Sequence, residues 1–114
     1  MLNNEDLTVE ASSGNVFADL AMPNAEERFA KAMLARSITH ILRQRGWTQA
    51  QGARAVGMAA SDISDIVRGK LARFSLDRLE SLILDLDMDI HIRISPKRGA
   101  RQRGQVSVQL EHTP

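Results

Sequence analysis

The sequence predicts a mainly α-helical domain of four to five helices with a C-terminal β-strand, and three observations support this prediction. Apolar residues recur at spacings of three and four over residues 25–45 and again over 75–86, which is the period of an amphipathic helix. Between these stretches, two short helical segments meet at Gly57, where a glycine permits a tight turn. After residue 87 the apolar period changes to two, which indicates a strand.

The stretch from Gln49 to Lys70 carries the most specific pattern in the chain. Ala53 lies four positions before Gly57, where two steeply crossing helices leave room only for a small side chain. Apolar residues flank the glycine and line one face of the helix that follows, namely Val56, Met58, Ile63, Ile66 and Val67. These positions together match a helix-turn-helix, and the alternative is an ordinary pair of antiparallel helices.

We divide the chain into four segments. Residues 1–23 form an acidic N-terminal arm, whose apolar patch (Val16, Phe17, Leu20 and Met22) predicts one helical turn docked on the domain. Residues 24–86 form the helix-turn-helix domain, with Asn24 as the expected N-cap of its first helix. Residues 87–95 form a strand through which we expect the protein to dimerise, and residues 96–114 form a basic, flexible tail.

The short helices of the motif have predictable ends. Thr48 is the expected N-cap of the helix over 49–56, whereas the helix over 60–68 has Ala59 at this position. Alanine supplies no capping oxygen, which costs about 1 kcal/mol relative to Ser or Thr. Gly52 inside the first of these helices costs about 1 kcal/mol relative to Ala. It either allows a close approach of the backbone to a neighbour or lies on an exposed turn.

The predicted strand alternates Met88, Ile90, Ile92 and Ile94 with polar residues. A single strand cannot satisfy its own backbone hydrogen bonds, so it must pair with another segment. The only other alternating stretch covers residues 106–110, which would give a hairpin within the chain. Pairing with the same strand of a second chain across a two-fold axis is the other arrangement that the pattern allows.

Composition limits the class of protein. The chain has 114 residues, 43% of them hydrophobic, which is enough for one small domain with a core. It has no Cys, and therefore neither a disulfide framework nor a thiolate site. No apolar run approaches the length of a membrane span and no signal peptide is visible, so we expect a cytoplasmic protein without a membrane partner.

The net charge of +1 hides an uneven distribution of charged residues. Residues 1–27 contain six acidic residues and no Lys or Arg, whereas residues 28–86 contain ten basic and five acidic residues. The tail over residues 96–114 is basic again. A basic core behind an acidic arm is the feature that bears on partners, because local charge determines which surfaces attract nucleic acid.

A helix-turn-helix inserts its second helix into the major groove, so the first turns of the helix over 60–68 should meet base edges. The exposed positions there are Ala60, Ser61, Asp62, Ser64 and Asp65. We expect base contacts from Ala60, Ser61, Ser64 and Asp65, although this set holds no Arg for guanine and no Asn or Gln for adenine. The aspartates can accept a hydrogen bond from cytosine N4 but repel phosphate, and Asp62 can equally serve the helix dipole.

Phosphate contacts are better supplied than base contacts. The candidates near the motif are Thr48, Gln49, Arg54, Arg68, Lys70 and Arg73. Each alone would be an ordinary solvated side chain, and it is their grouping around one face that indicates a phosphate surface. The three histidines are scattered without metal-ligand spacing and no glycine-rich phosphate loop occurs, so we expect no enzymatic activity, no metal and no cofactor.

The block TQAQGARAVGMAASDISDIVRGK, followed by FSLDRLESLILDL, resembles the Xre family, whose domain is the phage-repressor type of helix-turn-helix. More narrowly, SSGNVFADL, the following PNAEE and the RGK…RFSLDRL pattern are similar to HigA-type antitoxins. These motifs span residues 12–86. The resemblance implies a dimeric bacterial protein that binds double-stranded DNA and represses its own operon, often encoded beside a RelE-like ribonuclease toxin.

The resemblance also implies roles for single residues. The positions of the family that face phosphate correspond to Thr48, Gln49, Arg68 and Lys70, and those that face bases to Ala60, Ser61, Ser64 and Asp65. The chain departs from the family pattern at Trp47, a common Leu, at Ala59, usually a Ser or Thr cap, and at Ala60, a common Gln. The last two departures reduce the direct base readout that we expect.

Three functional readings follow from the sequence. In the first, the protein is a repressor and also an antitoxin, whose acidic arm binds a basic RelE/HigB-like ribonuclease with Phe17 and Leu20 as apolar anchors. In the alternative, it is a stand-alone Xre-type regulator with no toxin partner, and the arm packs on its own domain. A third reading, from a different class, is a nucleoid or RNA-binding protein that uses only the basic face.

Overall fold

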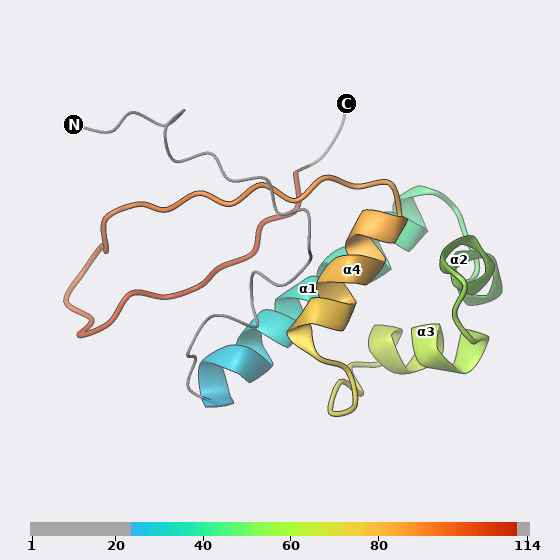
Figure 1. Cartoon of the computed structure of the whole chain (residues 1–114), viewed down its shortest axis with the longest axis horizontal. Coiled ribbons are helices and arrows are strands. Elements are labelled where there is room, and N and C mark those ends of the chain that lie inside the picture. Colours follow the sequence, from blue (N-terminus) through green and yellow to red (C-terminus); the bar gives the residue numbers. More distant parts are fainter. Residues whose placement is uncertain (1–23, 112–114) are drawn as a thin grey trace.

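The computed structural model describes residues 24–111, which contain four helices. The helices are α1 (Asn24–Gln44), α2 (Gln49–Val56), α3 (Ala60–Val67) and α4 (Leu76–Asp85). In Figure 1, α1 and α4 lie together in the centre of the domain, and α2 and α3 lie at one side of them. The mainly α-helical prediction is confirmed. The helical turn expected over residues 16–22 lies outside the described residues.

All four helices contribute to one apolar core. The apolar stripe of α1 is buried at Ile38 and Ile41, and the second helix of the motif is held by Ile63 and Ile66, each 1% exposed. The largest buried ring, Phe74, comes from the loop between α3 and α4. Burial of such side chains contributes about 1.5–3 kcal/mol each, so these contacts fix how α3 lies on the domain.

The ends of the two short helices follow the expectations from sequence, whereas Asn24, the expected N-cap of the first helix, is the first residue of α1. The Thr48 hydroxyl accepts a hydrogen bond from Gln51 N (3.1 Å), and Gln51 Oε1 accepts one from Thr48 N (2.7 Å), which completes a capping box. Ala59 occupies the N-cap of α3 and makes no side-chain cap hydrogen bond. Gly57 closes α2 in the left-handed region, with φ of 70°.

The backbone of α2 at Gly52 lies against the Leu42 side chain of α1. A Cβ atom placed on Gly52 would lie 2.8 Å from Leu42 Cδ2, and Leu42 is buried in the core. Ala53 beside it is 2% exposed. The interpretation of Gly52 as a point of close backbone approach is therefore confirmed: its backbone packs against the Leu42 side chain, where a larger residue would displace that side chain.

The strand expected over residues 87–95 is not confirmed. Within residues 24–111 no segment forms a β-ladder; instead, the chain leaves α4 in an extended form and returns along residues 105–111 (Figure 1). Met88, Ile90, Val108 and Leu110 pack partly on the core. Side chains anchor the two segments where they pass the core, and the segments separate farther from it. The alternating pattern therefore places apolar side chains on the core without forming the hydrogen bonds of a β-ladder. None of the described helices is long and apolar enough to cross a membrane.

Glu80 on α4 places a carboxyl group in the core. Its side chain is fully buried, and neither carboxyl oxygen has a hydrogen-bond partner in the part of the chain that the structure describes. Burial raises the pKa of this carboxyl above its ordinary value of 4.5, and the nearby Asp77 raises it further. A buried ionisable group without partners opposes folding whenever it is charged.

We predict that the stability of the domain depends on pH through Glu80. The folded-state pKa lies above the unfolded value, so the stabilising effect of the bound proton is complete below pH 4.5 and is lost as the pH rises through the folded-state pKa. Glu80→Met removes the titrating group and keeps a side chain of similar size. At neutral pH it should raise the free energy of unfolding by about 1–3 kcal/mol, measured by urea unfolding across the acidic and neutral range.

Asp85 provides the control, because it is an exposed carboxylate on the same helix. Asp85→Asn should change the free energy of unfolding by no more than about 0.5 kcal/mol. If wild type and Glu80→Met showed the same pH dependence, the buried carboxyl would not be its cause.

Candidate nucleic-acid interface

The outer face of α3 is the surface that the fold leaves for recognition. Burial of Ile63 and Ile66 turns the opposite side of the helix outward. Ala60 and Ser61 are exposed there, and Ser64 and Asp65 are half-buried. The four residues expected to meet bases thus come from one short helix, whose first turns carry only small or acidic side chains.

The two aspartates of α3 are joined by one arginine from the loop before α4. Arg73 Nη2 donates to Asp62 Oδ1 at 2.7 Å and to Asp65 Oδ2 at 2.8 Å. The hydrogen bond from Arg73 lowers the pKa of Asp65, and the hydrogen bonds to Asp65 and Asp62 raise the pKa of Arg73. We call Asp62, Asp65 and Arg73 the carboxylate clamp.

Two further arginines surround the carboxylate clamp at longer range. Arg68 Nη2 lies 3.8 Å from Asp65 Oδ1, and Arg78 Nη2 lies 3.8 Å from Asp62 Oδ2. The Arg73 guanidinium also lies over the Phe74 ring, 4.3 Å from its centroid, and Arg78 lies 5.5 Å from the same centroid. Stacking on a buried ring restricts where Arg73 can move, so the clamp is fixed to the core through Phe74.

The other residues expected to contact phosphate are distributed around α3. Gln49, Arg68 and Lys70 are exposed at the start of α2 and in the turn after α3. Thr48 uses its oxygen as an acceptor in the capping box, so its hydroxyl hydrogen is left to donate elsewhere. Arg54 is exposed on α2. The structure therefore brings Asp65, Arg68, Lys70 and Arg73 together and leaves Gln49 and Arg54 as separate surface groups.

Arg78 is a neighbour of the site that the local sequence does not indicate. Its link to the site is the 3.8 Å approach to Asp62, a residue on another helix. No local pattern predicts such a pair, because both partners look like ordinary solvated charges along their own helices. Only the packing of α4 beside α3 reveals the contact.

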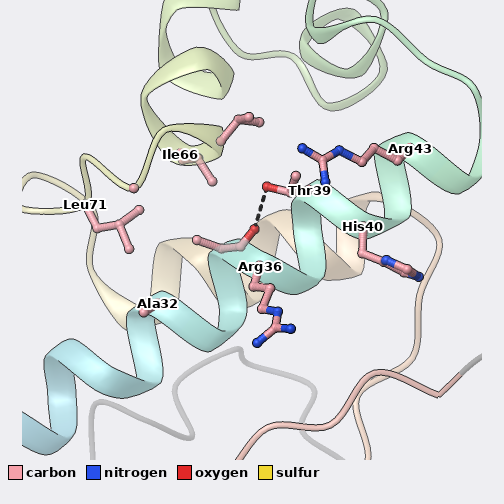
Figure 2. Close-up of a pocket in the computed structure, with 10 residues that line it drawn as sticks. Ala32, Arg36, Thr39, His40, Arg43, Ile66 and Leu71 are labelled. Atoms are coloured by element: carbon pink, nitrogen blue, oxygen red, sulfur yellow. Dashed lines mark hydrogen bonds between the residues drawn. The ribbon is translucent and has the colours of Figure 1, made fainter.

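A groove of about 420 Å³ lies beside α3, between α1 and residues 66–71 (Figure 2). Its α1 wall carries Thr39 and Arg43, and Arg43 extends along this wall on the side that faces α3, whereas Arg36 and His40 point away from α3 (Figure 2). No acidic residue lines the groove. Residues 28–61 contain six basic residues and no acidic one, so the charged side chains of this part of the chain are all basic.

Comparison with known proteins identifies the domain. A family model described as a helix-turn-helix domain matches residues 16–95. A solved structure named for the XRE family of transcriptional regulators is similar to 78% of this chain and 100% of its own, with 32% sequence identity and a TM-score of 0.70. A search of curated proteins gives no match. The chain therefore belongs to the XRE family of helix-turn-helix transcriptional regulators, which implies regulation through DNA binding.

Proposed function

We propose that this regulator is a sequence-specific repressor that binds DNA as a homodimer and acts as the antitoxin of a toxin–antitoxin pair. The observation that carries the DNA-binding part is the outward face of α3, which presents short polar side chains and is bordered by exposed cations. The major groove of DNA admits an α-helix, and the edges of the four base pairs can be distinguished there.

In the proposed complex, α3 lies in the major groove and its first turns face the bases. Ser61 and Ser64 supply hydroxyl groups, Ala60 offers its methyl group to thymine, and Asp65 offers an acceptor to an exocyclic amino group. The N-terminus of α2, with Thr48 and Gln49, faces one phosphate, because unpaired backbone N–H groups attract anions there. Arg68 and Lys70 face the backbone at the other end of α3.

The extended segment over residues 87–95 supports the homodimer. Ile92 and Ile94 are 51% and 83% exposed, and this segment forms no ladder within the described chain. An extended segment with exposed apolar side chains and unpaired backbone groups offers an edge for a second copy. A two-fold dimer would then bind half-sites about 34–36 Å apart in an inverted repeat.

The antitoxin role rests on charge and on the resemblance to HigA-type proteins. Residues 1–27 carry six acidic residues and no basic one, and an acidic segment suits the phosphate-binding surface of a RelE/HigB-like ribonuclease. Phe17 and Leu20 would add apolar anchors. The stand-alone regulator is the competing function, and the two differ in whether a cognate ribonuclease binds at all.

DNA binding should depend on phosphate contacts from Arg68 and Lys70. Replacing both with Ala should weaken binding to operator and to random DNA alike. It should also reduce the steepness of log K (the DNA association constant) against log salt concentration by about 2, because each lost phosphate contact means that about one counterion fewer is released from the DNA. Titrations at several salt concentrations measure both quantities. Arg28→Ala/Lys31→Ala removes the same charge from the N-terminal half of α1 and should change the slope little. If wild type bound no duplex DNA, the proposed function would be wrong.

The dimer should depend on backbone pairing between the two copies of residues 87–95. Ile92→Pro removes one backbone N–H, and this N–H takes part in no ladder within the described chain. The substitution should therefore leave the domain folded and yield monomers in light scattering. A folded variant that remains dimeric would place the interface elsewhere.

The antitoxin role should depend on the acidic arm. Removal of residues 1–23 should preserve DNA binding, because the motif is untouched, and should abolish binding to the ribonuclease encoded beside the gene. Co-purification of the two full-length chains provides the reference. The absence of any ribonuclease-like neighbouring gene would favour the stand-alone regulator.

A further inference from the structure

The recognition helix of this chain presents a physical problem for DNA binding. Its only charged residues are Asp62 and Asp65, and α3 has no basic residue of its own. Carboxylates near the DNA backbone are repelled by phosphate, and no counter-charge lies within the helix to cancel them. A mechanism that makes this helix compatible with DNA must come from another part of the fold.

Arg73 supplies both the charge and the geometry. A single guanidinium nitrogen bonds one oxygen of each aspartate, at 2.7 and 2.8 Å, so one cation bridges two carboxylates. The other oxygens lie 3.8 Å from arginine nitrogens: Asp62 Oδ2 from Arg78 Nη2, and Asp65 Oδ1 from Arg68 Nη2. This distance is too long for a hydrogen bond, so these oxygens retain lone pairs that can accept.

We propose that Arg73 is a positioning residue for base recognition, which offsets one of the two negative charges of α3 and orients Asp65 so that its free oxygen accepts a hydrogen bond from a base amino group. Cytosine N4 is the favoured partner, because carboxylates accept from it in the major groove. This inference rests on the proposed DNA-binding function. It assigns Arg73 a role other than the phosphate contact expected from sequence.

The two roles of Arg73 make opposite predictions in a mutant cycle. Arg73→Gln removes the charge and keeps the stem that covers Phe74, so the fold should be retained. In the wild-type background this change should weaken binding to random duplex DNA at least about tenfold, because two aspartates lose their counter-charge. In an Asp62→Asn/Asp65→Asn background the same change should cost about twofold or less. A phosphate contact would cost the same in both backgrounds.

The base preference of the protein distinguishes a positioning role of Arg73 from a merely structural one, because a structural role would leave this preference unchanged. Selection from randomised duplexes should show that Asp65→Asn and Arg73→Gln lose preference at the same base pair. Arg73→Lys should recover most of the affinity for random DNA but not this preference, because an ammonium lacks the planar guanidinium that stacks on Phe74. Thermal unfolding of each variant confirms that it is folded.

The outcomes separate this inference from the proposed function. If wild type bound no DNA, the proposed function would fail first. If wild type bound DNA and Arg73→Gln lost equal affinity in both backgrounds, Arg73 would be an ordinary phosphate contact and the positioning role would be wrong. Full base preference in a folded Arg73→Gln variant would also overturn it.

Discussion

Gly52 of α2 lies so close to the buried Leu42 side chain of α1 that even a methyl group at this position would meet it at 2.8 Å. This crossing sets where α2 lies, and the left-handed Gly57 then turns the chain directly into α3. Because Ile63 and Ile66 bury the inner face of α3, its outer face is left free for recognition. The orientation of the recognition surface thus follows from a contact on the opposite side of α2, in the core of the domain.

Electrostatics then decides what that surface can bind. The charged residues between positions 28 and 61 are all basic, whereas the charged residues of α3 are both acidic. Without compensation, α3 would be the part of the domain least suited to approach DNA. In the carboxylate clamp, Arg73 offsets one of the two negative charges of α3 and is itself fixed against Phe74. On the proposed function, the short loop between α3 and α4 therefore belongs to the DNA-binding surface together with α3.

Two other charged side chains, Arg45 and Glu80, also meet the interior of the fold, with opposite results. Arg45, at the end of α1, donates a hydrogen bond to the Leu86 carbonyl at the end of α4 and lies over the Trp47 ring. This contact satisfies a carbonyl that the helix leaves unpaired and joins the C-terminal ends of α1 and α4. Glu80 has no such compensation among the described residues. The tail is attached by apolar contacts and by the 3.8 Å approach of Arg103 to Glu26, so its path differs from that of a paired strand.

The sequence by itself determined the features that depend on residues a few positions apart. These include the Thr48 capping box, the uncapped Ala59, the turn at Gly57 and the apolar stripes, because the local backbone and the helical period are enough to specify them. It also identified the face of α3 that carries Ser61, Ser64 and Asp65. Only the tertiary structure decided that Arg73 bridges two aspartates, that Arg78 approaches Asp62, and that Glu80 is buried. The same is true of residues 88–95, whose alternating pattern predicts an extended chain but cannot supply the neighbour with which a strand would form hydrogen bonds.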